Sequence, residues 1–349
     1  MRLLIATQAV DRTDPILGFF HRWIEEFAKH SEKVTVICLR KGDYDLPANV
    51  EVISLGKMTH HRLTVLSRFA YAARFLRLIV NKRNEYDAVF VHMNPEYIVL
   101  GGVLWRAMGK RVGLWYTHKK VNCRLRIATV LSHVVFTASP ESFRLKSKKV
   151  AVMGHGVDVS DYAYASRAQI GEELRIITIG RISETKRIRE MIMTCDELSA
   201  RGIPFSLSII GMAATEEDEA YARALDGDVQ TRAYRDRVEI RSASHTEVPN
   251  LLKDADVFLN LSTTGSMDKA VLEALASGVP VVTSNEAFKD ALSPYGLFVS
   301  PLTPSAVADV LVHASEKNIA PLRAWVEKEH SLSSLASRII SRLENSKGI

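Results

Sequence analysis

The sequence predicts an α/β protein made of two doubly wound domains, each with a parallel sheet between layers of helices. Short apolar runs alternate with amphipathic helical stretches along most of the 349 residues. This alternation is interrupted by the polar stretch DVSDYAYASRAQIGEE and then starts again. The chain is long enough, and with 47% hydrophobic residues apolar enough, to bury two cores. We therefore predict domains at 1–155 and 156–330, and a final helix in 331–349 that packs back toward the first domain.

The first half contains the elements of one Rossmann-like domain with roughly seven strands. Each predicted strand is a short apolar run, and a polar or glycine-containing segment follows it. The predicted strands are 2–7, 34–39, 50–55, 87–93, 111–118, 133–139 and one within 149–158. The predicted helices are 19–29, 60–83 and 96–108, where apolar residues recur every three or four positions.

The second half repeats the alternation, although the two halves share no fixed-period sequence repeat. The predicted strands are 174–180, 205–211, 238–243, 257–262 and 280–284. The predicted helices are 188–202, 216–230, 248–255 and one that starts near Ser266 or Asp268. The tail from 305 to 345 is predicted to be helical, with Ser331 as a cap for the last helix.

The composition indicates a cytoplasmic protein without a transmembrane anchor. The first residues, MRLLIAT, are too few for the apolar core of a signal peptide, and no later apolar run approaches ~18 residues. Cys38, Cys123 and Cys195 are odd in number and lack CxxC spacing, which argues against a disulfide framework or a zinc site. The net charge of +6 fits anionic substrates, an anionic membrane surface or nucleic acid.

The predicted helix 60–83 is strongly basic and carries apolar and aromatic residues between its charges. Such a helix can lie on an anionic membrane, which would place the protein peripherally at the inner membrane face. The same pattern fits a domain helix with one core face and one solvated basic face. Its charged residues are Arg62, Arg68, Arg74, Arg77, Lys82 and Arg83.

The stretch TTGSMDKAVLEALASGVPVV, 263–282, carries the clearest signal for chemistry. A buried strand ends in a polar loop containing Gly265, and a helix capped by Ser266 or Asp268 follows. The first turn of a helix leaves backbone N–H groups unpaired in a field that favours anions, so phosphate is the natural ligand. Glu273 in the second turn can accept hydrogen bonds from sugar hydroxyls, or can be a surface residue paired with Lys269 at i,i+4.

Two cations follow the strand 174–180, in the segment RISETKRIRE. Arg181 and Lys186 lie at one helix N-terminus there. The Coulomb attraction between each of them and a diphosphate would be about 4 kcal/mol at an effective dielectric constant of 20, before the cost of desolvation. Gly18 lies where the first strand-to-helix loop meets its helix, and His118 ends a strand. These positions favour ligand contact at the carboxyl edge of a parallel sheet, but a turn glycine and a structural histidine explain them equally well.

These motifs together resemble the retaining glycosyltransferases of family 4. The resemblance rests on ITIGRISETKRI, on LEALASGVPVV and on GHGVD at 154–158, which is similar to the family's entry into its second domain. It implies the GT-B fold, in which two Rossmann-like domains face each other across a cleft. It also implies that Arg181 and Lys186 neutralise the donor diphosphate and that Glu273 holds the ribose. Gly18 would then approach the diphosphate or sugar, and His118 would lie beside the transferred sugar.

The sequence departs from the family pattern at one position. The family carries a second Glu eight residues before the ribose Glu, and this chain has Gly265 there. Asp268 is the candidate substitute, with Ser266 and Lys269 as further donor-binding candidates, while Asp268 fits a helix N-cap equally well. The Asp-Ala-Asp triplet at 254–256 directly precedes a buried strand in an α/β pattern, so we do not predict a metal site at Asp254 and Asp256.

The resemblance implies a metal-independent transferase with no cofactor, whose substrates are a nucleoside diphosphate sugar and a glycan or lipid-linked acceptor. It implies transfer with retention of anomeric configuration. One alternative is an epimerase or hydrolase of sugar nucleotides on the same fold. The other is a non-catalytic protein that binds membrane lipids or nucleic acid through its basic helix, although we do not expect nucleic acid as a partner.

Overall fold

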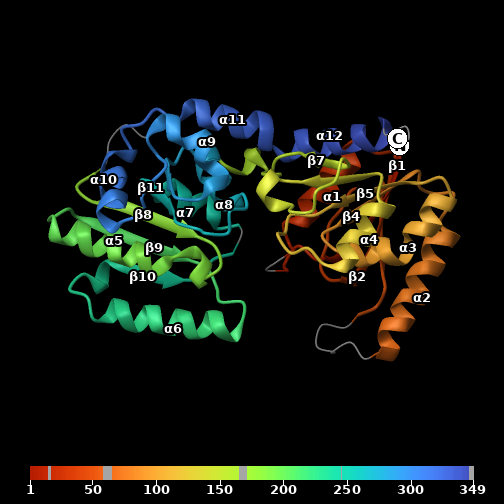
Figure 1. The fold of residues 1–349 in the computed structure, drawn as a ribbon, viewed down its shortest axis with the longest axis horizontal. Helices are drawn as coiled ribbons and strands as arrows, with labels where there is room; N and C mark the ends of the chain where they lie inside the picture. Colours follow the sequence, from red (N-terminus) through yellow and green to blue (C-terminus); the bar gives the residue numbers. More distant parts are fainter. Residues whose placement is uncertain (15–16, 58–64, 165–170, 245, 346–349) are drawn as a thin grey trace. The chain divides into compact units, whose positions relative to one another are not determined.

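The computed structural model describes residues 1–14, 17–57, 65–164, 171–244 and 246–345 (Figure 1). The chain forms two compact units. Unit 1 consists of Met1–Gly156 together with Leu332–Ile349, and unit 2 is Val157–Ser331. Within the described ranges, no helix is long and apolar enough to cross a membrane.

Unit 1 is built on a seven-stranded parallel sheet, as the sequence predicts, with the order β3-β2-β1-β4-β5-β6-β7. Strand β1 runs three residues farther than predicted, because Ala9 and Val10 pair with Arg40 and Lys41 of β2. The strands are β1 (Arg2–Val10), β2 (Lys33–Lys41), β3 (Val50–Ser54), β4 (Ala88–His92), β5 (Arg111–Trp115), β6 (Val134–Thr137) and β7 (Val150–Val152).

Helices cover both faces of this sheet, since strand side chains alternate between two buried clusters. Helices α1 (Phe20–Lys29) and α12 (Leu332–Asn345) pack on one face and contact each other. Helices α2 (Val65–Asn81), α3 (Pro95–Ala107) and α4 (Cys123–Leu131) pack on the other.

One prediction about these helices needs correction, and one helix is additional to the predicted ones. The basic helix ends at Asn81, so Lys82 and Arg83 lie beyond it, and residues 58–64 with Arg62 lie outside the described residues. Lys82 is moreover held by Glu51 and Glu85 at 2.8 and 3.1 Å. Helix α4 was not predicted, although the Asn122 side chain gives its start by accepting a hydrogen bond from the Leu125 amide at 2.9 Å.

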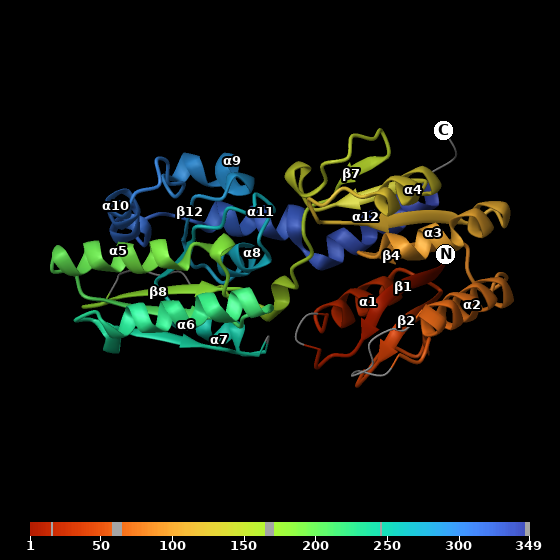
Figure 2. The same cartoon turned by 60° about the horizontal axis from the view of Figure 1, so that its bottom comes forward.

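Unit 2 contains a five-stranded parallel sheet with the order β10-β9-β8-β11-β12. Figure 2 labels two of these strands, β8 and β12. The strands of unit 2 are β8 (Leu174–Ile179), β9 (Phe205–Ile210), β10 (Val238–Arg241), β11 (Val257–Asn260) and β12 (Val281–Thr283). Its helices are α5 (Ile188–Ala200), α6 (Glu216–Gln230), α7 (Val248–Asp254), α8 (Lys269–Ala276), α9 (Lys289–Leu292), α10 (Pro304–Ala314) and α11 (Ala320–His330). The strand order changes direction between β8 and β11, and ligands of open α/β sheets bind outside the carboxyl ends of such a strand pair.

The loop that leaves β8 is fixed in place by a close backbone contact with the end of β9. A Cβ atom added at Gly211 would lie 1.8 Å from the carbonyl oxygen of Gly180. We expect Gly211→Ala to lower the free energy of unfolding by about 2 kcal/mol, because this backbone contact cannot relax cheaply. Urea unfolding measures the effect. Gly227→Ala in α6, where an added Cβ meets nothing within 4 Å, is the matched control and should be neutral or slightly stabilising. Equal stability of the two variants would contradict the expectation.

Candidate active site

The carboxyl ends of β8 and β11 bring two of the predicted site residues together. Lys186 ends a short 3₁₀ turn after β8, and its Nζ lies 2.8 Å from Oδ1 of Asp268, the N-cap residue of α8. The other carboxylate oxygen of Asp268 accepts a hydrogen bond from Asn260 Nδ2, also at 2.8 Å. The Asp268 side chain accepts no capping hydrogen bond from the backbone of its own helix and instead holds the Lys186 ammonium beside the helix N-terminus.

A buried polar network supports this ion pair, and sequence reasoning missed it. Thr283 Oγ1 donates to Asn260 Oδ1 at 3.0 Å, and Asn285 Nδ2 donates to the carbonyl oxygen of Ser266 at 2.9 Å. Asn260, Thr283 and Asn285 are buried at the ends of β11 and β12. The sequence feature that indicates this network is Asn260, a polar residue near the end of the otherwise apolar run VFLNL.

Arg181 lies in the same loop as Lys186 but is held by a different carboxylate. Its Nε is 3.7 Å from Asp218 Oδ2 in the first turn of α6, and its side chain is half exposed. Thr215 caps that helix by accepting from the Asp218 amide, so the acidic run there serves a helix N-terminus. The structure therefore keeps the two predicted cations on one loop without pairing them to a common group.

Glu273 lies in the second turn of α8 and is only 5% exposed. The predicted i,i+4 partner is present, with Lys269 Nζ 3.2 Å from Glu273 Oε1, but the pair is not on the surface. Although this oxygen lies within ion-pair distance, it makes no geometrically sound hydrogen bond to any described residue. Burial, followed by the nearby Glu273 carboxylate, raises the pKa of the Tyr162 hydroxyl far above its usual value. A buried carboxylate oxygen without a hydrogen bond is suited to accept one from a ligand hydroxyl.

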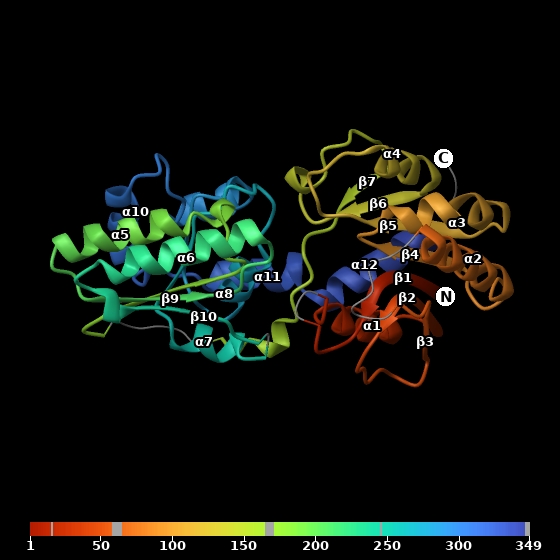
Figure 3. The same cartoon turned by 90° about the horizontal axis from the view of Figure 1, so that it is seen from below.

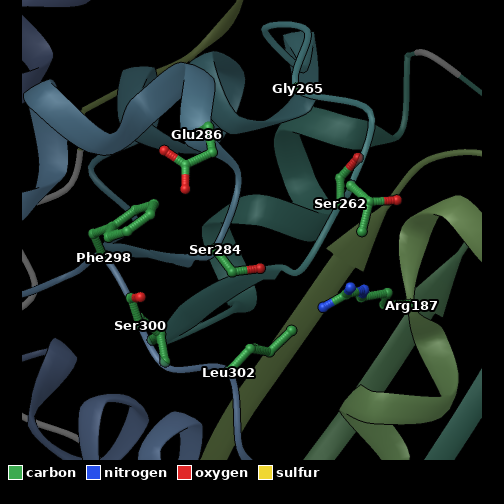
Figure 4. A pocket seen from close by; sticks show the side chains of 10 residues that line it. Arg187, Ser262, Gly265, Ser284, Glu286, Phe298, Ser300 and Leu302 are labelled. Atoms are coloured by element: carbon green, nitrogen blue, oxygen red, sulfur yellow. The ribbon is translucent and has the colours of Figure 1, made fainter.

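A cavity of about 300 Å³ adjoins the loop after β11 (Figure 4). Gly265 lines it with a left-handed backbone, φ 57°, which a glutamate would adopt only at a cost of roughly 1 kcal/mol. This conformation gives a physical reason for glycine at the position where the family has Glu. The cavity is lined by Arg187, Ser262, Thr263, Gly265, Ser284, Glu286, Phe298, Val299, Ser300 and Leu302.

The other two predicted residues, Gly18 and His118, belong to unit 1. A Cβ atom at Gly18 would lie 2.6 Å from the carbonyl oxygen of Asp14, so packing within its own loop already requires glycine. His118 is exposed three residues after β5, and its Nδ1 accepts a hydrogen bond from the Lys120 amide at 3.0 Å. The roles of Gly18 and His118 beside a donor stay predictions.

Asp256, rejected above as a metal ligand, has a structural partner. Its carboxylate lies 2.7 Å from Arg175 Nη2 and also accepts a hydrogen bond from the Arg175 backbone amide. Because Asp256 and Arg175 lie at the amino ends of β11 and β8, they are at the opposite edge of the sheet from Lys186 and Asp268.

A buried histidine should make unit 1 sensitive to acid. His92 ends β4 at 2% exposure, stacks on Phe20 with ring centroids 3.9 Å apart, and has a pKa lowered by burial to about 3. The unfolded chain therefore binds one more proton than the folded chain between about pH 6.5 and 3. Folding stability should fall by about 1.4 kcal/mol per pH unit as the pH drops through this range.

Urea unfolding at several pH values, followed by the fluorescence of the neighbouring Trp23 and Trp115, measures this slope. His92→Gln should reduce the slope by that amount, while the exposed His30→Gln should leave it unchanged. An identical slope in all three proteins would show that His92 does not carry the acid sensitivity.

The sequence matches two glycosyl transferase family models. Residues 173–317 match the model of glycosyl transferases group 1, and residues 16–117 match the glycosyl transferase 4-like model. The putative colanic acid biosynthesis glycosyltransferase WcaL of Salmonella typhimurium is 34% identical over 154 residues, which are 40% of this chain and 36% of the relative. The amylovoran biosynthesis glycosyltransferase AmsK of Erwinia amylovora is 29% identical over 199 residues, 52% of this chain and 47% of the relative. These matches thus span about a third to a half of the curated relatives.

Solved structures match the fold over the whole chain. Anabaena Alr3699/HepE in complex with UDP has a TM-score of 0.74 at 16% identity, covering 99% of this chain and 100% of that one. A glycosyltransferase from Rickettsia africae has a TM-score of 0.76 at 12% identity, covering 98% of both chains. At such identities the likeness concerns the fold alone. The two family models together show that the chain belongs to the group 1, or family 4, glycosyltransferases, and the solved structures show that it has the GT-B fold.

Proposed function

We propose that the protein is a retaining glycosyltransferase that moves a sugar from a nucleoside diphosphate sugar to a hydroxyl of a glycan or lipid-linked acceptor. The observation that carries the proposal is the arrangement of Lys186, the N-terminus of α8 and the buried Glu273 at the carboxyl ends of β8 and β11. This arrangement combines a cation, unpaired backbone N–H groups and a carboxylate within one loop and two helical turns.

In this proposal the donor diphosphate lies between Lys186 and the first turn of α8, with Arg181 swinging from Asp218 to join it. Glu273 accepts hydrogen bonds from the two ribose hydroxyls, which gives Oε1 a hydrogen bond in addition to its ion pair with Lys269. Ser266 and Lys269 border the donor from the loop and first turn of α8. Positive charge at the leaving group then comes from the chain itself, so transfer needs neither a cofactor nor a metal ion.

We assign the transferred sugar to the cavity beside Gly265. Its volume is at the lower end of the range of small-molecule sites. Phe298 and Leu302 offer an apolar wall, while Ser262, Ser284 and Ser300 offer hydroxyls for the polar rim of a sugar ring (Figure 4). Asp268, beside this loop, is the proposed substitute for the carboxylate that Gly265 lacks.

The proposed chemistry breaks the bond between the anomeric carbon and the diphosphate oxygen. The acceptor oxygen bonds to the same face of that carbon, and its proton passes to an oxygen of the departing diphosphate. Lys186 and the helix N-terminus stabilise the negative charge that develops on the leaving group, an interaction stronger in the transition state than in the ground state.

A screen of nucleoside diphosphates and their sugars by calorimetry tests the donor site, and NMR of the product formed with an acceptor gives the anomeric configuration. The proposal expects binding of a nucleoside diphosphate and transfer with retention. Turnover of the donor without any acceptor would instead favour the epimerase or hydrolase alternative. Absence of binding to every nucleoside diphosphate would refute the donor site.

A further inference from the structure

Helices α2, α3 and α4 form a layer of unit 1 (Figure 1 and Figure 3), and several large apolar side chains of this layer are exposed. Helix α3 packs against α4 on one side and against α2 on the other, so their exposed residues belong to one surface. We call this surface the α2–α4 face, defined by Leu66, Phe69, Leu100, Val103, Leu104, Ile127 and Val130. Among these, Leu66, Phe69, Val103 and Val130 are between 63% and 83% exposed.

Helix α3 shows that the exposure is a property of a whole helix side. Ile98 and Trp105 face the core and are fully buried. Leu100, Val103 and Leu104 follow the i, i+3, i+4 spacing of a second apolar stripe, and this stripe faces outward. A helix that is apolar on both sides needs a second partner besides its core, since contiguous exposed apolar patches mark interaction sites.

The charges on these three helices are almost all positive. Helices α2 to α4 carry one acid, Glu96, which pairs with Arg124 at 2.9 Å. Their basic residues are Arg68, Arg74, Arg77, Arg106, Arg124 and Arg126. Apolar residues flanked by arginine, with hardly any acid, make the surface complementary to an interface that is apolar inside and negative outside.

We propose that the α2–α4 face docks onto an anionic lipid bilayer, with its apolar residues entering the headgroup region and its arginines contacting lipid phosphates. A second copy of the chain fits less well, because an isologous contact of this face would place six arginines against six. The docking surface lies on helices that contain none of the donor-binding residues proposed above. The docking proposal can therefore be tested independently of the proposed transferase function.

Cosedimentation of the full chain with vesicles tests this, using phosphatidylcholine with and without phosphatidylglycerol and no donor or acceptor. The unaltered chain should bind the anionic vesicles, and the double variant Val103→Asp, Val130→Asp should bind them at least tenfold more weakly. Met193→Asp, at an exposed apolar position of α5 in unit 2, is the matched control and should bind like the unaltered chain. Unfolding curves establish that each variant folds.

A second pair of variants tests the charges without touching apolar residues. Arg77→Gln and Arg126→Gln, both exposed, should each weaken binding to anionic vesicles by about fivefold and make it less sensitive to salt. The proposal is overturned if the chain binds no anionic vesicles, or if the aspartate variant binds as well as the control. It is also overturned if the face instead mediates self-association, which sedimentation velocity would show as a dimer that the aspartate variant abolishes. Binding of an acidic protein to the face, without binding of anionic vesicles, would overturn it as well.

Discussion

Lys186→Ala should lower the rate of sugar transfer by a factor on the order of 100 to 1,000 and largely abolish binding of the nucleoside diphosphate. The Lys186 ammonium group is held beside the N-terminus of α8, where it is largely buried and lies 2.8 Å from the Asp268 carboxylate. Its loss removes the charge that stabilises the leaving group. It also leaves the Asp268 carboxylate as an uncompensated negative charge where the diphosphate should bind.

Calorimetry with the nucleoside diphosphate and initial rates of transfer measure the two effects separately. Lys317→Ala, an exposed lysine after α10 in the same unit, is the matched control and should behave like the unaltered protein. Lys186→Arg keeps the charge but replaces the compact ammonium with a larger planar guanidinium, so it should recover only part of the binding. Near-normal transfer by Lys186→Ala, in a protein that still folds, would refute the assignment of the diphosphate site.

The sequence determines most of the fold because its signals are local. The apolar runs of a parallel sheet are nearly continuous, so strands such as β4 and β8 are recognisable from the sequence alone. Helix α6 begins and ends at the predicted residues because its acidic first turn and Thr215 mark the start. Helix α4 was not predicted because its two arginines alternate with apolar residues and obscure the helical period.

The candidate site was predictable only in part, because its geometry depends on residues far apart in the sequence. Lys186 and Asp268 were each predicted as site residues, but their ion pair links positions 82 residues apart. Asn260 and Asn285, which orient that pair through the ends of β11 and β12, gave no family-like motif. The position of Glu273 was predicted, whereas its burial depends on the packing of α8, and α8 contacts α11.

The ion pair between Lys186 and Asp268 also raises a question about donor binding, because a carboxylate already occupies the side of Lys186 that a phosphate would need. A unit charge about 6 Å from a phosphate opposes it by roughly 3 kcal/mol at an effective dielectric constant of 20, before solvent and ions weaken the effect. Removing the charge of Asp268 should therefore strengthen nucleoside diphosphate binding. Removing its carboxylate should weaken transfer, if Asp268 holds a sugar hydroxyl as proposed.

Asp268→Asn should thus bind the nucleoside diphosphate about tenfold more tightly, a gain of about 1.4 kcal/mol, while its turnover falls by a factor on the order of 100. Asparagine keeps the size of the side chain and can still accept the hydrogen bond from Asn260, so the loop should keep its shape. Asp290→Asn, an exposed acid of α9, is the matched control. Weaker nucleotide binding by Asp268→Asn would mean that the carboxylate positions Lys186 for the phosphate. Unchanged turnover would remove Asp268 from the sugar site, and the missing glutamate at Gly265 would then have no substitute at this position.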